Sequence, residues 1–157
     1  MPVLSALRRN HAIEHATIAV LFERRGRVLD VTAWSDPWGF SLRGRFSTDE
    51  VESAAGEAIR RLQAGERSLA ITPFCGTNIA LAGVLASTAA LLARGWRRSS
   101  LANALGAGVL GAAAAVPAGA WLQRRVTTDP EAAGTLVGPV RTLPTPLGRV
   151  VRVGLHR

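Results

Sequence analysis

The chain has 157 residues and a formal net charge of +8, and all 19 of its basic residues are arginines. This length suits one compact domain, or a smaller domain with membrane segments. A nucleic-acid-binding protein is disfavoured, because arginines gather at the ends of long apolar runs and not on a basic face with aromatic residues. The one cysteine excludes an intramolecular disulfide.

The first elements in chain order are a helix and two strands. An apolar stripe with Gly26 after it predicts an amphipathic helix over residues 3–23. The short β-branched stretch 27–34 and the alternating stretch 40–46 predict strands, and the sequence SDPWG between them is typical of a turn.

A second helix and a third strand complete the predicted N-terminal domain. Ser47 and Glu50 have the spacing of a capping box and precede apolar residues on one helix face. The stretch 68–72, SLAIT, is interpreted as a strand. The order helix–strand–strand–helix–strand predicts an α+β domain over residues 1–75, with both helices on one face of a small sheet.

Two long uncharged runs follow and predict a transmembrane helical hairpin over residues 76–123, with spans at about 76–93 and 100–122. Glycine and alanine recur in the second run at spacings that allow close helix contact. The Pro- and Gly-rich basic tail, 124–157, either forms short strands that add to the N-terminal sheet or lies disordered at the membrane surface. Because charged residues interrupt the first 20 positions, no export signal is visible, and we expect the N-terminal domain in the cytoplasm.

The motif HAIEH places His11 and His15 four residues apart, so that both imidazoles can approach one ion from the same helix face. Glu14 lies beside that face. This is the H-x-x-E-H arrangement of the inverted zincins, in which the histidines bind zinc and the glutamate is a general base. Zinc needs a third protein ligand, and Cys75 in the sequence FCGTN is a thiolate candidate. Unliganded histidines on an ordinary amphipathic helix are the alternative.

The order of HAIEH, the SDPWG turn, the STDE helix start and FCGTN resembles S-ribosylhomocysteine lyase over about residues 10–78. The resemblance implies that His11, His15 and Cys75 bind the metal and that Glu14 is the acid/base. The lyase has a second cysteine after its Pro-x-Gly turn, where this chain has Phe40, so we do not expect appreciable cleavage of S-ribosylhomocysteine. Over its whole length the chain also resembles a family of small bacterial membrane proteins with an HAxEHAT motif and no known activity.

A more distant resemblance to the insulinase-type metallohydrolases implies a glutamate as third ligand, with Glu50, Glu52 and Glu57 as candidates. A structural zinc would instead need a fourth protein ligand, and His156 is the remaining histidine. Trp34 and Trp38 are interpreted as core or membrane-edge aromatics.

These features together predict a membrane-anchored, zinc-dependent hydrolase or lyase-like protein of unknown substrate. The alternative is a non-catalytic membrane protein with a structural or vestigial metal site that acts as an assembly module. Expected partners are the lipid bilayer and an unknown small molecule or peptide, without nucleic acid, and a homodimer is left open.

Overall fold

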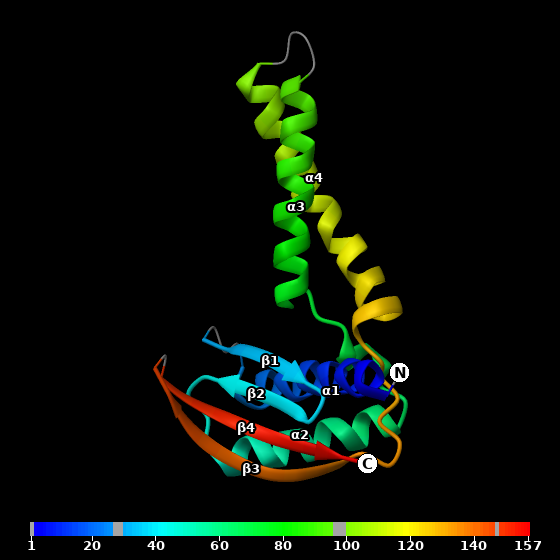
Figure 1. Cartoon of the computed structure of the whole chain (residues 1–157), viewed down its shortest axis with the longest axis vertical. Helices are drawn as coiled ribbons and strands as arrows, with labels where there is room; N and C mark the ends of the chain where they lie inside the picture. Colours follow the sequence, from blue (N-terminus) through cyan, green and yellow to red (C-terminus); the bar gives the residue numbers. More distant parts are fainter. Residues whose placement is uncertain (1, 27–29, 96–99, 147) are drawn as a thin grey trace. The chain divides into compact units, whose positions relative to one another are not determined.

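The computed structural model describes residues 2–26, 30–95, 100–146 and 148–157, which form two compact units. The first unit comprises residues 1–71 and 126–157, and the second comprises residues 72–125. The class is α+β, as the sequence predicts. The first unit holds a four-stranded sheet and two helices, and the second is a helical hairpin (Figure 1).

The first unit begins with α1 (Pro2–Arg25), followed by β1 (Thr32–Asp36) and β2 (Gly39–Arg43). The helix α2 (Thr48–Gln63) has the predicted capping box, in which the Ser47 side chain accepts from the Glu50 amide and Glu50 reaches back to the Ser47 amide. The strands β3 (Leu136–Thr145) and β4 (Gly148–His156) come from the C-terminal tail. The sheet is antiparallel in the order β1-β2-β4-β3.

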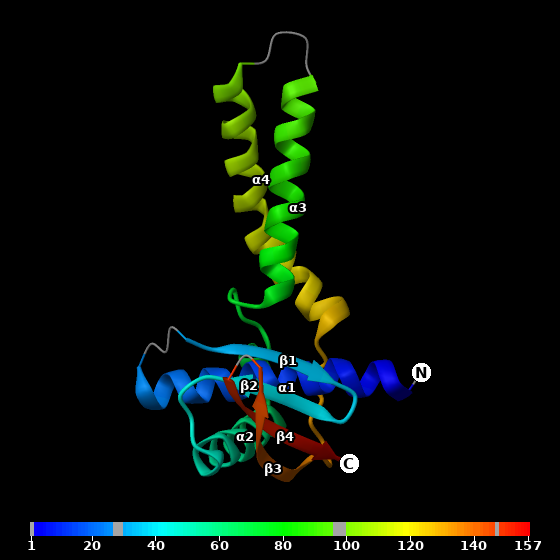
Figure 2. The same ribbon diagram turned by 60° about the vertical axis from the view of Figure 1, so that its left-hand side comes forward.

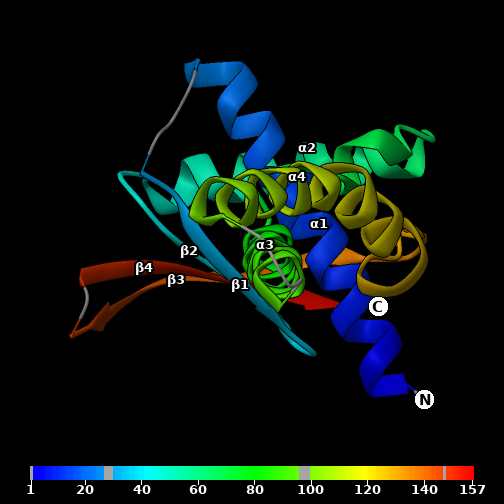
Figure 3. The same cartoon turned by 90° about the horizontal axis from the view of Figure 1, so that it is seen from above.

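The core of this unit lies between one face of the sheet and both helices, which cover the same side of it, as the sequence predicts (Figure 3). Phe40 of β2 pairs with Val153 of β4, and both side chains are fully buried against α1 and α2. Ile13 and Leu21 of α1 complete the centre of the cluster. This packing holds α1, and therefore the HAIEH motif, in a fixed position on the sheet.

Three predicted strands differ from the observed elements. Residues 68–72 form no strand, because Arg67–Ala70 is a 3₁₀ helix whose turn is closed by the Ile71 amide on the Ser68 carbonyl. The strand β4 from the tail lies beside β2, which confirms the first of the two alternatives for the tail. The first strand covers Thr32–Asp36, and residues 27–29 of the predicted strand lie outside the described residues. The second strand covers Gly39–Arg43 and ends before the predicted residue 46.

The second unit consists of α3 (Gly76–Gly95) and α4 (Leu101–Leu122), which pack side by side in opposite directions (Figure 2). A Cβ added at Gly111 would collide with the Leu85 carbonyl, so the glycine allows close backbone contact, as its spacing predicts. By length and composition both helices are able to cross a membrane. A π-helical turn, Gln123–Thr127, follows α4.

Candidate metal centre

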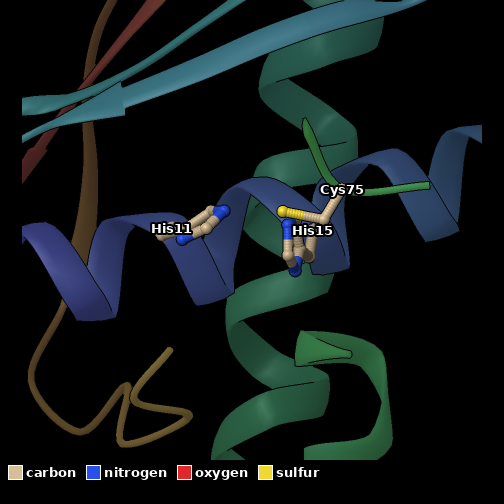
Figure 4. A group of neighbouring side chains, drawn as sticks. All are labelled: His11, His15 and Cys75. Carbon is tan, nitrogen blue, oxygen red and sulfur yellow. The ribbon is translucent and has the colours of Figure 1, made fainter. Parts of the chain in front are cut away.

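The two motif histidines lie on consecutive turns of α1, with their ring centroids 4.3 Å apart. Cys75 immediately precedes α3 and is almost fully buried, with 6% of its surface exposed. One ligand atom from each of His11, His15 and Cys75 lies within 4.8 Å of the other two (Figure 4). Because two imidazoles and a thiol are donors that transition metals prefer, this group could hold a metal ion.

The hydrogen bonds of the two imidazoles determine which ring nitrogen can bind a metal. The Nδ1 atom of His15 lies 2.8 Å from the Ala70 carbonyl oxygen, and that of His11 lies 3.1 Å from the Thr127 carbonyl oxygen. Since a carbonyl oxygen only accepts, each Nδ1 carries the hydrogen and each Nε2 carries the lone pair. Metal-binding histidines commonly have their second nitrogen held in this way. The sequence did not indicate these carbonyl partners, which come from the 3₁₀ helix and from the turn after α4.

Glu14 projects from the same helix and is 5% exposed. Its carboxylate accepts a hydrogen bond from the Ser35 hydroxyl on β1. Ser35 begins the SDPWG sequence, so one residue of that turn region does reach the motif. The Ser35 hydroxyl therefore holds this buried carboxylate in one orientation.

Asn10 is a neighbour of the motif that the sequence reasoning missed. Its side chain is fully buried and donates through Nδ2 to the Asp36 carbonyl at 2.8 Å. It precedes Glu14 by four residues, so both contact β1 from one face of α1. The Arg152 guanidinium, which donates to Asp36 at 2.8 Å, holds the pKa of the Asp36 carboxyl below its usual value. This end of β1 is thereby fixed to both α1 and β4.

Other residues singled out in the sequence lie elsewhere. Within the part of the chain that the structure describes, the metal-ligand group does not include His156, which is exposed at the end of β4. Glu50 and Glu57 form ion pairs with Arg25 and Arg24. The insulinase-type assignment of a third ligand therefore has no support in this geometry.

Three aromatic residues that the sequence singled out are Phe40, Trp34 and Trp38. Phe40 is fully buried in the core. Trp34 and Trp38 are exposed, Trp38 by 74%, so neither is a core residue.

Comparison with known proteins identifies a family but no activity. Residues 6–140 match the model of a domain of unknown function, DUF6391. The chain is 34% identical over 140 residues to Uncharacterized protein SYNPCC7002_A1392 of Picosynechococcus sp., a match that covers 78% of this chain and 65% of the relative. The chain thus spans slightly less than two thirds of that relative's length. No solved structure matches. The matched region contains the histidine motif, Cys75 and both long apolar helices, and the protein belongs to the DUF6391 family.

Proposed function

We propose that this protein is a membrane-anchored metalloenzyme in which His11, His15 and Cys75 hold a zinc ion and Glu14 is the general base of a hydrolytic or lyase reaction. The convergence of the two imidazoles and the thiol within 4.8 Å carries the proposal. The fixed Nδ1 hydrogen bonds of both histidines add support, because they leave the two lone pairs on the nitrogens that would bind the ion.

The number of ligands favours a catalytic site over a structural one. Structural zinc is almost always held by four protein ligands, whereas catalytic zinc has three and an open position. In the described ranges the group contains three residues, and His156 is not among them. When bound, the ion would act as a Lewis acid on the oxygen of water or of a substrate carbonyl.

Glu14 supplies the proton transfer in this proposal. Its carboxylate, held by Ser35, would accept a proton from the attacking water or from the substrate carbon and then return it to the leaving group. The order of motifs that resembles S-ribosylhomocysteine lyase supports the same assignment. Phe40 cannot take up or donate a proton, so a reaction that needs a second acid/base at that position is disfavoured.

The membrane anchor is the helical hairpin. The helices α3 and α4 are apolar enough to cross a bilayer, and few of their residues are buried, unlike those of core helices in soluble proteins. We expect the protein to remain in the membrane fraction after an alkaline carbonate wash and to need detergent for extraction. Recovery of monodisperse protein in buffer alone would overturn the membrane assignment.

A direct test uses the full chain in nanodiscs with a panel of peptide, ester and thioether substrates. The zinc-loaded wild type should turn over one class, and a chelator should stop the reaction. Glu14→Gln should lose turnover at unchanged zinc content, because the amide cannot accept the proton. Equal turnover by wild type and Glu14→Gln would exclude the general-base role.

A further inference from the structure

Polar contacts hold the segment that carries Cys75. Phe74, next to the cysteine, is 70% exposed, so it does not anchor the segment in a core. The Phe74 amide instead bonds to the Thr72 hydroxyl at 3.3 Å. The Cys75 carbonyl accepts the amide hydrogens of Asn78 and Ile79 at the start of α3. The position of the thiol therefore depends on what holds residues 72–75.

The side-chain amide of Gln123 holds this segment through two hydrogen bonds. Gln123 is fully buried at the end of α4, and its Oε1 accepts the Thr72 amide at 2.9 Å while its Nε2 donates to the Thr72 carbonyl at 2.9 Å. One side chain thus binds both backbone polar groups of a single residue, three positions before Cys75. Two bonds of this kind fix the orientation of the segment as well as its place.

Asn78 extends this network across the base of the hairpin. Its Nδ2 donates to the Thr72 carbonyl at 3.1 Å and to the Pro73 carbonyl at 3.3 Å, and its Oδ1 accepts from Gln123 at 3.0 Å. Gly119 of α4 makes room for it, because a Cβ at that position would collide with Asn78 Oδ1. Loss of any partner would leave buried polar groups unsatisfied, which is costly.

We propose that Gln123, Asn78 and Gly119 form a clasp that positions the Cys75 thiol for metal binding. These are positioning residues, because they act through Cys75 and touch no reacting atom. The inference rests on the proposed metal site, but it concerns residues to which that site assigns no role. Polar partners that orient metal ligands typically change metal affinity 10- to 100-fold when they are removed.

The test measures Co²⁺ and Zn²⁺ affinity of the full chain in nanodiscs, together with the sulfur-to-cobalt charge-transfer absorption that reports thiolate ligation. Two variants open the clasp: Gln123→Met, which keeps the side-chain length without hydrogen bonds, and Gly119→Ala, which displaces Asn78. Matched controls are Asn103→Ala, an exposed amide of α4, and Gly106→Ala, where an added Cβ meets nothing within 4 Å.

Both clasp variants should bind metal about 10- to 100-fold more weakly and lose charge-transfer intensity, whereas both controls should match the wild type. The alkylation rate of Cys75, the single cysteine, provides a readout without metal and should rise in the clasp variants. If Gly119→Ala does not fold, Gln123→Met decides. Wild-type affinity, absorption and alkylation rate in Gln123→Met would overturn the clasp alone, whereas a wild type that binds no metal would overturn the metal site and the clasp together.

Discussion

The Nδ1 atom of His15 lies 2.8 Å from the carbonyl oxygen of Ala70, five residues before Cys75 in the chain. This hydrogen bond fixes the imidazole tautomer and ties α1 to the segment that leads to the thiol. A bound ion should add to the stability of this arrangement, because a ligand that binds only the folded state stabilises it.

We therefore predict that a chelator lowers the thermal unfolding midpoint of the wild type by several degrees. At a zinc concentration of about 100 times Kd, bound zinc contributes about 2.7 kcal/mol, which corresponds to a shift of roughly 5–10 °C at this chain length. His15→Ala should be insensitive to the chelator, whereas His156→Ala should respond like the wild type. Differential scanning calorimetry with and without chelator measures both effects, and an unchanged wild-type midpoint would argue against a bound metal.

The bond from Ser35 to Glu14 predicts a stability effect that is independent of metal. Ser35→Ala leaves a buried carboxylate without one of its donors, which should lower the free energy of unfolding by about 1–3 kcal/mol. Thr32→Ala removes an exposed hydroxyl from the same strand and should change it by less than about 0.5 kcal/mol. Denaturant titration of metal-depleted protein compares the two. Equal effects would mean that Ser35 does not support Glu14.

The close contact of α3 and α4 at Gly111 predicts that a larger residue there destabilises the hairpin. Gly111→Leu must push against the Leu85 carbonyl and should cost about 1–3 kcal/mol. Gly106→Leu occupies open space and is the matched control. Thermal unfolding in detergent measures the difference between the variants. A hairpin that tolerates leucine equally at both positions would contradict the observed packing.

Much of the fold follows from local sequence patterns, but the closing strand does not. The capping box at Ser47 is a local signal, and α2 forms as predicted. The first helix also forms, although Leu4 of its predicted apolar stripe is exposed. The stretch 68–72 has strand-like residues, yet β4 takes the place beside β2. That choice depends on pairing between residues about 110 positions apart, as for Phe40 and Val153, and no local pattern encodes it.

The sequence likewise predicted one part of the candidate site and not the other. The i, i+4 spacing of His11 and His15 and the resemblance around Cys75 were sufficient to predict the group that converges in the structure. The residues that hold it in place could not be predicted, because the Ala70 and Thr127 carbonyls are backbone groups without a sequence signature. Ser35 and Asn10 become recognisable only once β1 is placed against α1.

The ion pair between Asp36 and Arg152 predicts a pH dependence of stability. The hydrogen bond from Arg152 lowers the Asp36 pKa in the folded state below the reference value of 3.8. The contribution of this ion pair to the free energy of unfolding is therefore fully present above about pH 4. It is lost as the pH falls through the folded-state pKa of Asp36. The midpoint difference between wild type and Asp36→Asn should be constant from pH 7 to about pH 4.5 and shrink below that. If the difference between the two midpoints instead grew as the pH fell, it would contradict the lowered pKa of Asp36.

The most direct test of the metal centre is the metal content of the protein purified in detergent without added metal, compared with that of Cys75→Ala. We predict about one zinc per chain in the wild type and little or none in Cys75→Ala, because a two-histidine site lacks the third ligand. His156→Ala, which changes a histidine outside the group, should retain the wild-type content. A wild type without transition metal, or a Cys75→Ala variant that holds as much as the wild type, would contradict the assignment of His11, His15 and Cys75 as the metal ligands.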